Sequence, residues 1–263
     1  MSGFLENILA HKKEEIALAR KQNSMEALRD RAMFSLPRRS FRAALSGKAP
    51  TFIAEVKKAS PSKGVIRESF DHKEIAGQYV RGGAHALSVL TDEEFFQGSL
   101  SYLEDLRNRV HVPLLRKDFI VDSYQLLETR AFGADALLLI AAALDSRHLA
   151  ELYTEAHELG LDCLVEIHSE RELDSVAGIR EGILGVNNRD LSTFHTDIET
   201  SFRLRPFLPG DAITVSESGI NAASDVRALA KCGYQAVLVG EMLMKSEKPQ
   251  ETLQHLIAES LFS

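Results

Sequence analysis

Short runs rich in Leu, Ile, Val and Ala recur along this chain from residue 51 onward, and they limit the possible folds more than any other feature. Each run is nearly continuous in apolar residues instead of alternating with polar ones, which is typical of strands buried on both faces. Strands of this kind belong to parallel sheets that are covered by helices. There are eight runs: Thr51–Val56, Ala84–Leu90, Val112–Leu115, Ala136–Ile140, Cys163–Ile167, Ile183–Val186, Ile213–Val215 and Ala236–Val239.

The segments between the runs have the periodicity of amphipathic helices. In Ser146–Leu159 the apolar residues that share one helix face are Leu149, Leu152, Tyr153 and Ala156. Asn221–Cys232 is a second such segment, and Gly233 would end it. Strands and helices that alternate eight times predict parallel βαβ units, and eight units close into a barrel. We therefore predict an α/β fold, a (β/α)8 TIM barrel, in one domain that spans residues 1–263.

Residues 1–48 precede the first run and predict an N-terminal helical extension. One helix would carry Phe4, Ile8, Ile16 and Leu18. A second would span Met25–Phe34. The extension could cap apolar barrel surface or form a roof over the active site. It ends in a basic loop, Pro37–Arg42, which is too short in an acidic chain to indicate a nucleic-acid tail. At the other end of the chain, Gln250–Leu261 is expected to form the last barrel helix.

Composition narrows the classes of partner. Lys and Arg number 31 against 38 Asp and Glu, a formal net charge of −7, so the surface as a whole repels nucleic acid and anionic membranes. No apolar run is long enough to span a membrane, and the charged N-terminal segment lacks the apolar stretch of a signal peptide. Cys163 and Cys232 are too few for a disulfide framework, and no Cys/His cluster has zinc-ligand spacing. Cys163 is expected in the core. We expect a soluble, cytoplasmic protein without a metal site.

In a parallel barrel the chemistry is built at the carboxyl ends of the strands, so polar residues there are candidates for the site. Glu55 and Lys57 lie two residues apart and therefore share one face of the first strand, which points into the barrel if Ile53 also lies on it. Charges inside a barrel are costly unless they are paired or functional, and the two residues could form only an ion pair. Later runs add polar residues that would converge on the same mouth: Lys117, Glu166, Asn187 and Arg189.

Lysines and glutamates together supply both a general acid and a general base, which a reaction that moves protons in both directions requires. A second lysine nearby would lower the pKa of a lysine and a carboxylate would raise it, so the direction depends on geometry. His168, two residues after Glu166, is left outside this core set.

The last two runs indicate a phosphate site. Ser218 and Gly219 follow the seventh run and Gly240 follows the eighth, and each loop leads into a helix. The loops after strands 7 and 8 are the usual phosphate site of such barrels, where amides at helix starts bind the anion. Glycine lets the backbone approach the phosphate oxygens closely, although both positions could be ordinary turn glycines.

Several stretches of the chain resemble motifs of the indole-3-glycerol-phosphate synthase family, which belongs to tryptophan biosynthesis. The most specific stretch is Ile53–Ser62, with the sequence IAEVKKASPS. The others follow in the order expected for the family: Leu115–Ile120, Leu164–Ile167, Gly185–Leu191 and Ser216–Ile220. The resemblance covers the whole barrel and the helical extension.

The resemblance implies a carboxy-lyase that acts on 1-(o-carboxyphenylamino)-1-deoxyribulose 5-phosphate without a cofactor. Lys117 would be the general acid that protonates the substrate carbonyl oxygen, and Glu166 the general base for dehydration. Glu55 and Asn187 would orient the catalytic groups and the sugar hydroxyls. Lys57 would neutralise substrate anions.

The resemblance also implies the groups that bind the substrate. Ser60 and Arg189 would steer the anthranilate carboxylate, and Phe96 would belong to an apolar pocket for the aryl ring. The phosphate would contact Ser218, Gly219, Gly240 and the backbone amide of Glu241. The Glu241 carboxylate would have to point away. The implied partner is a small phosphorylated molecule, and association with other tryptophan-pathway enzymes is a further expectation.

Other functions remain open from the residues alone. The isomerase that precedes this step in the pathway would need a Cys and Asp acid–base pair on strands 1 and 6, where Glu55 and Asn187 stand. A Schiff-base aldolase would be trapped by borohydride with its carbonyl substrate. A barrel that only binds a phosphate ligand or a protein would form no indole, and the charges at the mouth would be unexplained.

Overall fold

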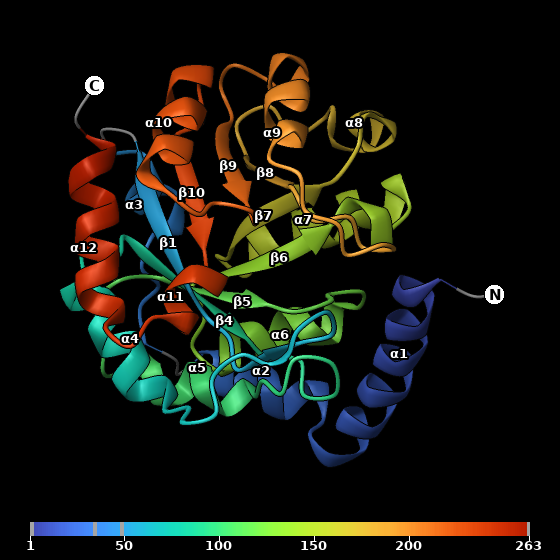
Figure 1. Cartoon of the computed structure of the whole chain (residues 1–263). Coiled ribbons are helices and arrows are strands. Elements are labelled where there is room, and N and C mark those ends of the chain that lie inside the picture. The colour runs from blue at the N-terminus through green and yellow to red at the C-terminus, as the bar shows by residue number, and fades with distance from the viewer. Residues whose placement is uncertain (1–2, 34–35, 48–49, 262–263) are drawn as a thin grey trace.

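The computed structural model of the chain describes residues 3–33, 36–47 and 50–261, and at its centre parallel strands close into a barrel (Figure 1). Neighbouring strands follow the order β1-β10-β9-β8-β7-β6-β5-β4, and β4 pairs with β1. The predicted (β/α)8 TIM barrel is therefore confirmed. In the part of the chain described, the barrel strands are β1 (Thr51–Val56), β4 (Ala86–Leu90), β5 (Leu114–Lys117), β6 (Ala136–Ile140), β7 (Asp162–Ile167), β8 (Ile183–Asn187), β9 (Ile213–Glu217) and β10 (Ala236–Val239).

Each apolar run overlaps one barrel strand, but β5, β8 and β9 continue past the carboxyl ends of their runs. β5 continues to Lys117 and β9 to Glu217. Charged residues remain part of these strands because they pair with each other inside the barrel. A small antiparallel pair, β2 (Ala59–Ser60) with β3 (Gly64–Val65), forms in the loop after β1.

Helices surround the strands, with α12 and α4 on the left of Figure 1 and α1 at the lower right. The helix predicted at Ser146–Leu159 is α7, and the one at Asn221–Cys232 is α10. α10 begins two residues late because the backbone N–H groups of Asn221 and Ala222 donate to the Asp225 carboxylate. Gly233 ends it with φ 102°. The outer helices are α4 (His72–Arg81), α5 (Leu100–Arg107), α6 (Ser123–Ala131), α7 (Ser146–Glu158), α8 (Leu173–Val176), α9 (Glu199–Leu204), α10 (Ala223–Cys232) and α12 (Pro249–Ser260).

The core has an inner and an outer layer because successive side chains on a strand point to opposite sides. Inside the barrel, Ile53, Leu115 and Ala236 belong to one buried cluster. Between strands and helices, Phe52, Leu87 and the thiol-bearing Cys163 belong to another. Since Ile53 faces inward, Glu55 two residues later does too. The expectation that Cys163 is a core residue is confirmed.

The N-terminal extension packs against both ends of the barrel. Its helices are α1 (Phe4–Gln22), α2 (Met25–Met33) and α3 (Phe41–Leu45). At the base, Phe41 and Leu45 of α3 complete the inner cluster, and the backbone N–H of Arg42 donates to Asp162 at the start of β7. At the mouth, α1 contributes cavity wall. Leu18 of α1 is 58% exposed, unlike the rest of the predicted apolar face. Phe34, the predicted end of the second helix, lies outside the described residues.

Candidate active site

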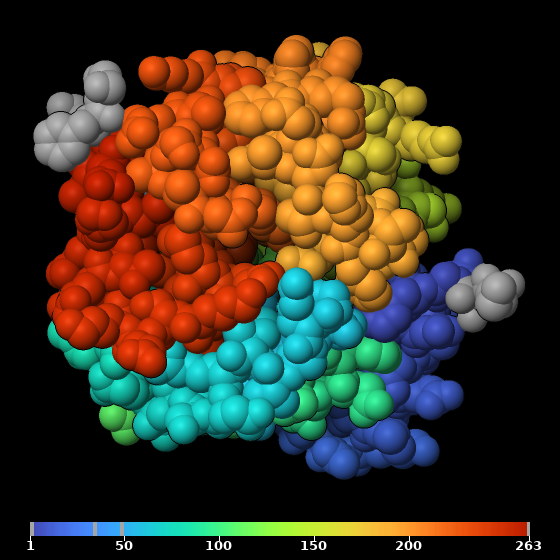
Figure 2. All heavy atoms as spheres, in the orientation of Figure 1, coloured from blue at the N-terminus to red at the C-terminus, as the bar shows by residue number. Residues whose placement is uncertain are grey.

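The carboxyl ends of the barrel strands surround a cavity. Figure 2 shows this face hollowed near its centre, between cyan, orange and red parts of the chain that are far apart in sequence. One part of the hollow is mainly apolar, and a second, more polar part adjoins it. The two share lining residues, among them Glu55, Lys57 and Arg189. All the candidate residues from the sequence line one part or the other: Glu55, Lys57, Ser60, Phe96, Lys117, Glu166, Asn187, Arg189, Ser218, Gly219, Gly240 and Glu241.

Lys117 is the centre of the charge network. Its Nζ lies 2.7 Å from Glu166 Oε2 and 2.7 Å from Glu217 Oε2. The three residues come from β5, β7 and β9, and their side chains are only 13%, 2% and 1% exposed, in that order. Alternate strands contribute side chains to the same layer of such a barrel, which explains why these three meet.

Burial and pairing shift the pKa values of this group in different directions. Burial alone would lower the pKa of Lys117, but Glu166, Glu217 and Glu55 raise it above its ordinary value, so the ammonium stays charged. Burial alone would raise the pKa of Glu166, but Lys117 and His168 hold it below its ordinary range. Burial raises the pKa of Glu217 to about 7, because its attraction to Lys117 is offset by repulsion from Glu166.

Glu217 is a functional candidate that the sequence analysis did not select. It shares its strand face with Ile213 and Val215, which lie in the inner cluster. The same two-residue spacing that selected Glu55 would therefore have found it. Gly185 on β8 leaves room for it, since a Cβ there would lie 2.1 Å from Glu217 Oε1.

Glu55 and Lys57 form the predicted ion pair within the cavity. The pairing and a functional role are compatible, because both residues line the apolar and the polar parts. Gly240 packs against Glu55, and a Cβ at Gly240 would lie 2.5 Å from Glu55 Oε1. The glycine therefore has a packing reason in addition to the predicted approach of a phosphate.

His168 lies beside Glu166, although the sequence analysis set it aside. Its Nε2 is 3.2 Å from Glu166 Oε1, and its Nδ1 is 3.4 Å from Glu172 Oε2. Burial would lower the pKa of His168, but the two carboxylates raise it to about 10. Glu166 therefore stands between two cations, Lys117 and His168.

The polar part of the hollow is formed by the ends of β8, β9 and β10. Ser218 and Gly219 adopt left-handed backbone conformations with φ 65° and 76°. Such a conformation is strained for serine and is characteristic of functional sites. Arg189 Nη1 donates to Ser62 Oγ at 3.2 Å, and its Nη2 is 3.2 Å from Glu241 Oε2. The Glu241 carboxylate also binds Lys245 at 2.6 Å. Asn187 Oδ1 accepts from the backbone N–H of Arg189.

The apolar part is walled partly by the extension. Phe4, Leu5 and Ile8 of α1 face it together with Phe96 and Phe119 from the loops after β4 and β5. The charged network of Lys117 lines the same part of the hollow as these apolar side chains. The arrangement offers proton donors and acceptors beside an apolar pocket, next to a polar pocket suited to an anion.

The described residues contain no group of three or more His, Cys, Asp or Glu side chains placed to hold a metal ion. None of their helices combines the length and the apolar composition that a membrane crossing needs.

Comparison with protein families gives one match over nearly the whole chain. The family model "Indole-3-glycerol phosphate synthase" matches residues 5–256. Proteins named indole-3-glycerol phosphate synthase from Burkholderia multivorans and Burkholderia vietnamiensis are each 48% identical over 257 residues, which is 96% of this chain and 98% of theirs.

Solved structures with low identity share the fold. 3-Hexulose-6-phosphate synthase from Salmonella typhimurium matches with a TM-score of 0.64 at 14% identity, over 81% of this chain and 99% of that one. Thiamine phosphate pyrophosphorylase from Pyrococcus furiosus matches with a TM-score of 0.60 at 14% identity, over 84% and 98%. These two comparisons support the barrel architecture alone.

Proposed function

The chain belongs to the indole-3-glycerol phosphate synthase family, and from this premise we propose how its residues share the reaction. The enzyme is a carboxy-lyase of tryptophan biosynthesis. It converts 1-(o-carboxyphenylamino)-1-deoxyribulose 5-phosphate into indole-3-glycerol phosphate, with loss of carbon dioxide and water. The isomerase, aldolase and binding-protein alternatives are set aside because the family match spans nearly the whole chain.

Lys117 acts as the general acid in ring closure. Its ammonium donates a proton to the substrate carbonyl oxygen while the aromatic carbon that bears the carboxylate attacks the carbonyl carbon. The new C–C bond leaves a hydroxyl on the former carbonyl carbon and an iminium in the ring. The carboxylates that raise the pKa of Lys117 keep the group protonated at neutral pH, so its proton is present when the carbonyl oxygen gains negative charge.

Carbon dioxide then leaves, and its bonding electrons neutralise the iminium. Glu166 acts as the general base in the step that follows, in which the ring loses a proton and the hydroxyl departs as water. Its lowered pKa keeps it ionised and able to accept that proton. Glu217, with a pKa raised to about 7, is suited to return a proton to Lys117 or to the leaving hydroxyl.

The remaining candidates bind and orient the substrate. The aryl ring occupies the apolar part of the hollow against Phe96, and Ser60 and Arg189 steer its carboxylate. Lys57 neutralises substrate anions, while Glu55 and Asn187 orient the catalytic groups and the sugar hydroxyls. The phosphate occupies the polar part, at Ser218, Gly219, Gly240 and the backbone amide of Glu241. The Glu241 carboxylate is turned towards Arg189 and Lys245, which supports contact through the amide.

One observation carries the assignment: the Lys117 ammonium lies 2.7 Å from two buried carboxylates, and all three groups line the apolar part of the hollow, which adjoins the polar part. A proton donor and a proton acceptor are thereby held within reach of a bound aryl-amino sugar phosphate.

The test is to mix the purified protein with this substrate and follow indole fluorescence, which no tryptophan emission of the protein obscures because the chain has no tryptophan. We expect Lys117→Ala to lower kcat by about 10²–10⁴-fold, the usual contribution of a general acid. Binding of inorganic phosphate should survive, since Lys117 does not line the polar part. Lys231→Ala on the exposed side of α10 is the matched control. A normal kcat in Lys117→Ala would end the assignment.

We also propose that the enzyme works in the cytoplasm and associates with other tryptophan-pathway enzymes. Two free cysteines, Cys163 and Cys232, support a reducing compartment. Fractionation of cells and co-purification with pathway enzymes would test the two proposals.

A further inference from the structure

Lys12 is a lysine of the N-terminal extension whose side chain is completely buried. It lies on α1, and its Nζ is 2.9 Å from Asp92 Oδ2, 2.9 Å from Asp118 Oδ1 and 2.9 Å from Glu15 Oε2. The carboxyl groups of Asp92 and Asp118 are 0% and 1% exposed. Lysine and aspartate are almost never buried to this extent unless they are paired, so the contact with the two loops is a built feature.

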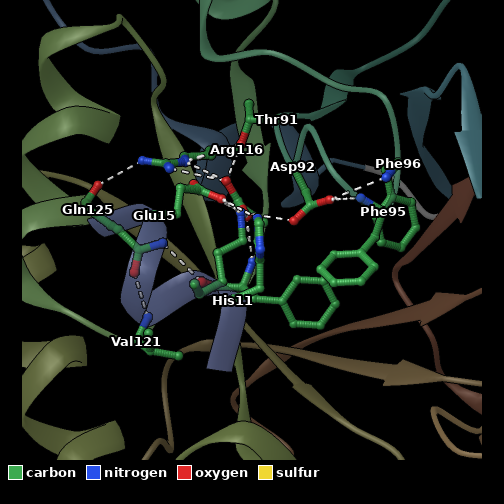
Figure 3. Close-up of polar contacts among 12 residues, drawn as sticks. His11, Glu15, Thr91, Asp92, Phe95, Phe96, Arg116, Val121 and Gln125 are labelled. Atoms are coloured by element: carbon green, nitrogen blue, oxygen red, sulfur yellow. Dashed lines mark hydrogen bonds and ion pairs between the residues drawn. The ribbon is translucent and has the colours of Figure 1, made fainter. Parts of the chain in front are cut away.

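The two aspartates also shape the loops that wall the apolar part of the hollow. Asp92 Oδ1 accepts the backbone N–H groups of Phe95 at 2.7 Å and Phe96 at 3.2 Å. Figure 3 shows Asp92 pointing at this stretch of backbone. Asp118 follows Lys117 directly, and it accepts from Thr91 Oγ1 at 2.6 Å and from the backbone N–H of Phe119 at 2.8 Å. The ammonium of Lys12 therefore joins the loops after β4 and β5.

On its own helix, Lys12 lies below the residues that face the hollow. Ile8 precedes it by one helical turn and Phe4 by two, so the three side chains share one face of α1. Ile8 and Phe4 line the apolar part together with Phe96. The ion pairs of Lys12 thus fix the helix face that lines the apolar part of the hollow.

The charges in this cluster depend on Lys12. Burial alone would lower the pKa of Lys12, but Asp118, Asp92 and Glu15 raise it above its ordinary value, so the ammonium stays charged at neutral pH. Asp118 has a second cation, since Arg116 Nη2 lies 3.1 Å from its Oδ2. Among the described residues, Lys12 is the cation that forms an ion pair with Asp92. Removing the ammonium would leave Asp92 buried without a compensating charge, and burial of an unpaired charge is strongly unfavourable.

We propose that Lys12 is a positioning residue for the reaction. It holds α1 against the apolar part of the hollow. Through Asp92 it fixes the position of Phe96, and through Asp118 it fixes the end of β5 that carries Lys117. It lies under the wall and does not line the hollow. This inference rests on the proposed function, because its test measures binding of the substrate's aryl ring in the apolar part of the hollow.

The test compares Lys12→Met, which keeps the length of the side chain and removes its charge, with Lys13→Met at the exposed neighbouring position. Two ligands distinguish the two parts of the hollow. Inorganic phosphate binds the polar part alone, whereas a reduced substrate, with an alcohol in place of the ketone, binds both parts. We expect Lys12→Met to weaken binding of the reduced substrate by about tenfold or more, as loss of a buried ion pair can. Phosphate affinity should stay unchanged. Backbone amides of residues 5–22 should exchange hydrogen faster. Lys13→Met should resemble the wild type in each measurement.

A purely structural role would weaken the binding of both ligands equally. That result would overturn the proposal, as would unchanged affinity for the reduced substrate.

Should Lys12→Met fail to fold, the double variant Lys12→Met/Asp92→Asn provides the test. It removes the unpaired charge, keeps an acceptor for the backbone of Phe96, and leaves Asp118 paired with Arg116. We expect it to fold, to bind phosphate and to remain weak for the reduced substrate. A wild-type protein that forms no indole would refute the proposed function, whereas active wild type with an equally active Lys12→Met would refute only this inference.

Discussion

Lys117 is attracted to more negative charge than one ammonium can balance. Glu166 and Glu217 both contact it at 2.7 Å, and Glu55 adds to the field. Two carboxylates that share one cation cannot both ionise easily when they are buried, so the pKa of one of them rises. The pKa of Glu217 rises to about 7, which brings a proton transfer group into the range where the enzyme works.

At this residue scale we expect a pH effect on stability. The pKa of Glu217 is about 7 in the folded protein, against an ordinary 4.5. Its contribution to the free energy of unfolding is therefore fully present below pH 4.5 and is lost as the pH rises through 7. The free energy of unfolding can be measured in urea for the wild type and for Glu217→Gln. The difference, wild type minus variant, should fall by up to about 3 kcal/mol as the pH rises across this interval.

The matched control for this measurement is Glu158→Gln, on the exposed side of α7. It should leave the pH dependence of the wild type intact. A difference between wild type and Glu217→Gln that stays constant with pH would show that Glu217 has no raised pKa.

At the scale of elements, glycines decide where the strands can hold charged side chains. Gly185 on β8 pairs with Val215 on β9, and its missing side chain leaves space for the carboxylate of Glu217, two residues further along β9. Glycine inside a strand is unfavourable for backbone entropy, so its presence marks a place where something must approach closely. Here the close neighbour is a carboxylate of the charge network.

Gly185→Ala should therefore reduce activity far more than stability. The added Cβ would lie 2.1 Å from Glu217 Oε1, the end of a flexible side chain that can rotate away. Rotation would take Glu217 from Lys117, and we expect kcat/KM for indole formation to fall by about 10–100-fold, as misplacement of about 1 Å can cause. Gly210→Ala, where the added Cβ meets no atom within 4 Å, should change neither activity nor Tm. Equal activity in the two variants would contradict the argument.

At the scale of the whole molecule, the extension and the barrel share their buried surfaces. α3 fills the base of the inner cluster, while Ile8 of α1 belongs to the same cluster from the mouth. Ile16 of α1 packs with Leu28 of α2 and Tyr124 of α6 in a third cluster. Because the extension contributes side chains to the buried clusters at both ends of the barrel, it should not unfold separately from the barrel. We therefore propose that residues 1–263 form one domain.

Calorimetry tests this proposal. We expect a single unfolding transition whose calorimetric and van't Hoff enthalpies agree. Inorganic phosphate at about 100 times its Kd should stabilise the fold by about 2.7 kcal/mol and raise Tm, since it binds the folded state alone. A lower, separate transition that disappears when residues 1–48 are removed would show that the extension is an independent unit.

Local patterns in the sequence determined the barrel and most of the candidate site. Apolar runs buried on both faces and the helical periodicity between them predict the fold, because burial of strands depends mainly on their own composition. Motif residues such as Lys117 and Glu166 stand at strand ends, where the fold brings them together. These features need no knowledge of distant contacts.

Only the tertiary structure decided which partners meet. Glu217 was missed, and β5 and β9 were predicted too short, because the apolar pattern treats a charged residue as the end of a strand. His168 was left outside the predicted site, because its spacing from Glu166 does not show that the two side chains meet. In the folded chain these charges are stabilised by residues from other strands, as in the pair of Lys117 with Glu217, 100 residues apart. Lys12 shows the same limit, since on sequence it is one charge in a charged helix, and its burial follows from two aspartates on remote loops. Electrostatic pairing in a buried site depends on three-dimensional proximity, which sequence spacing does not encode.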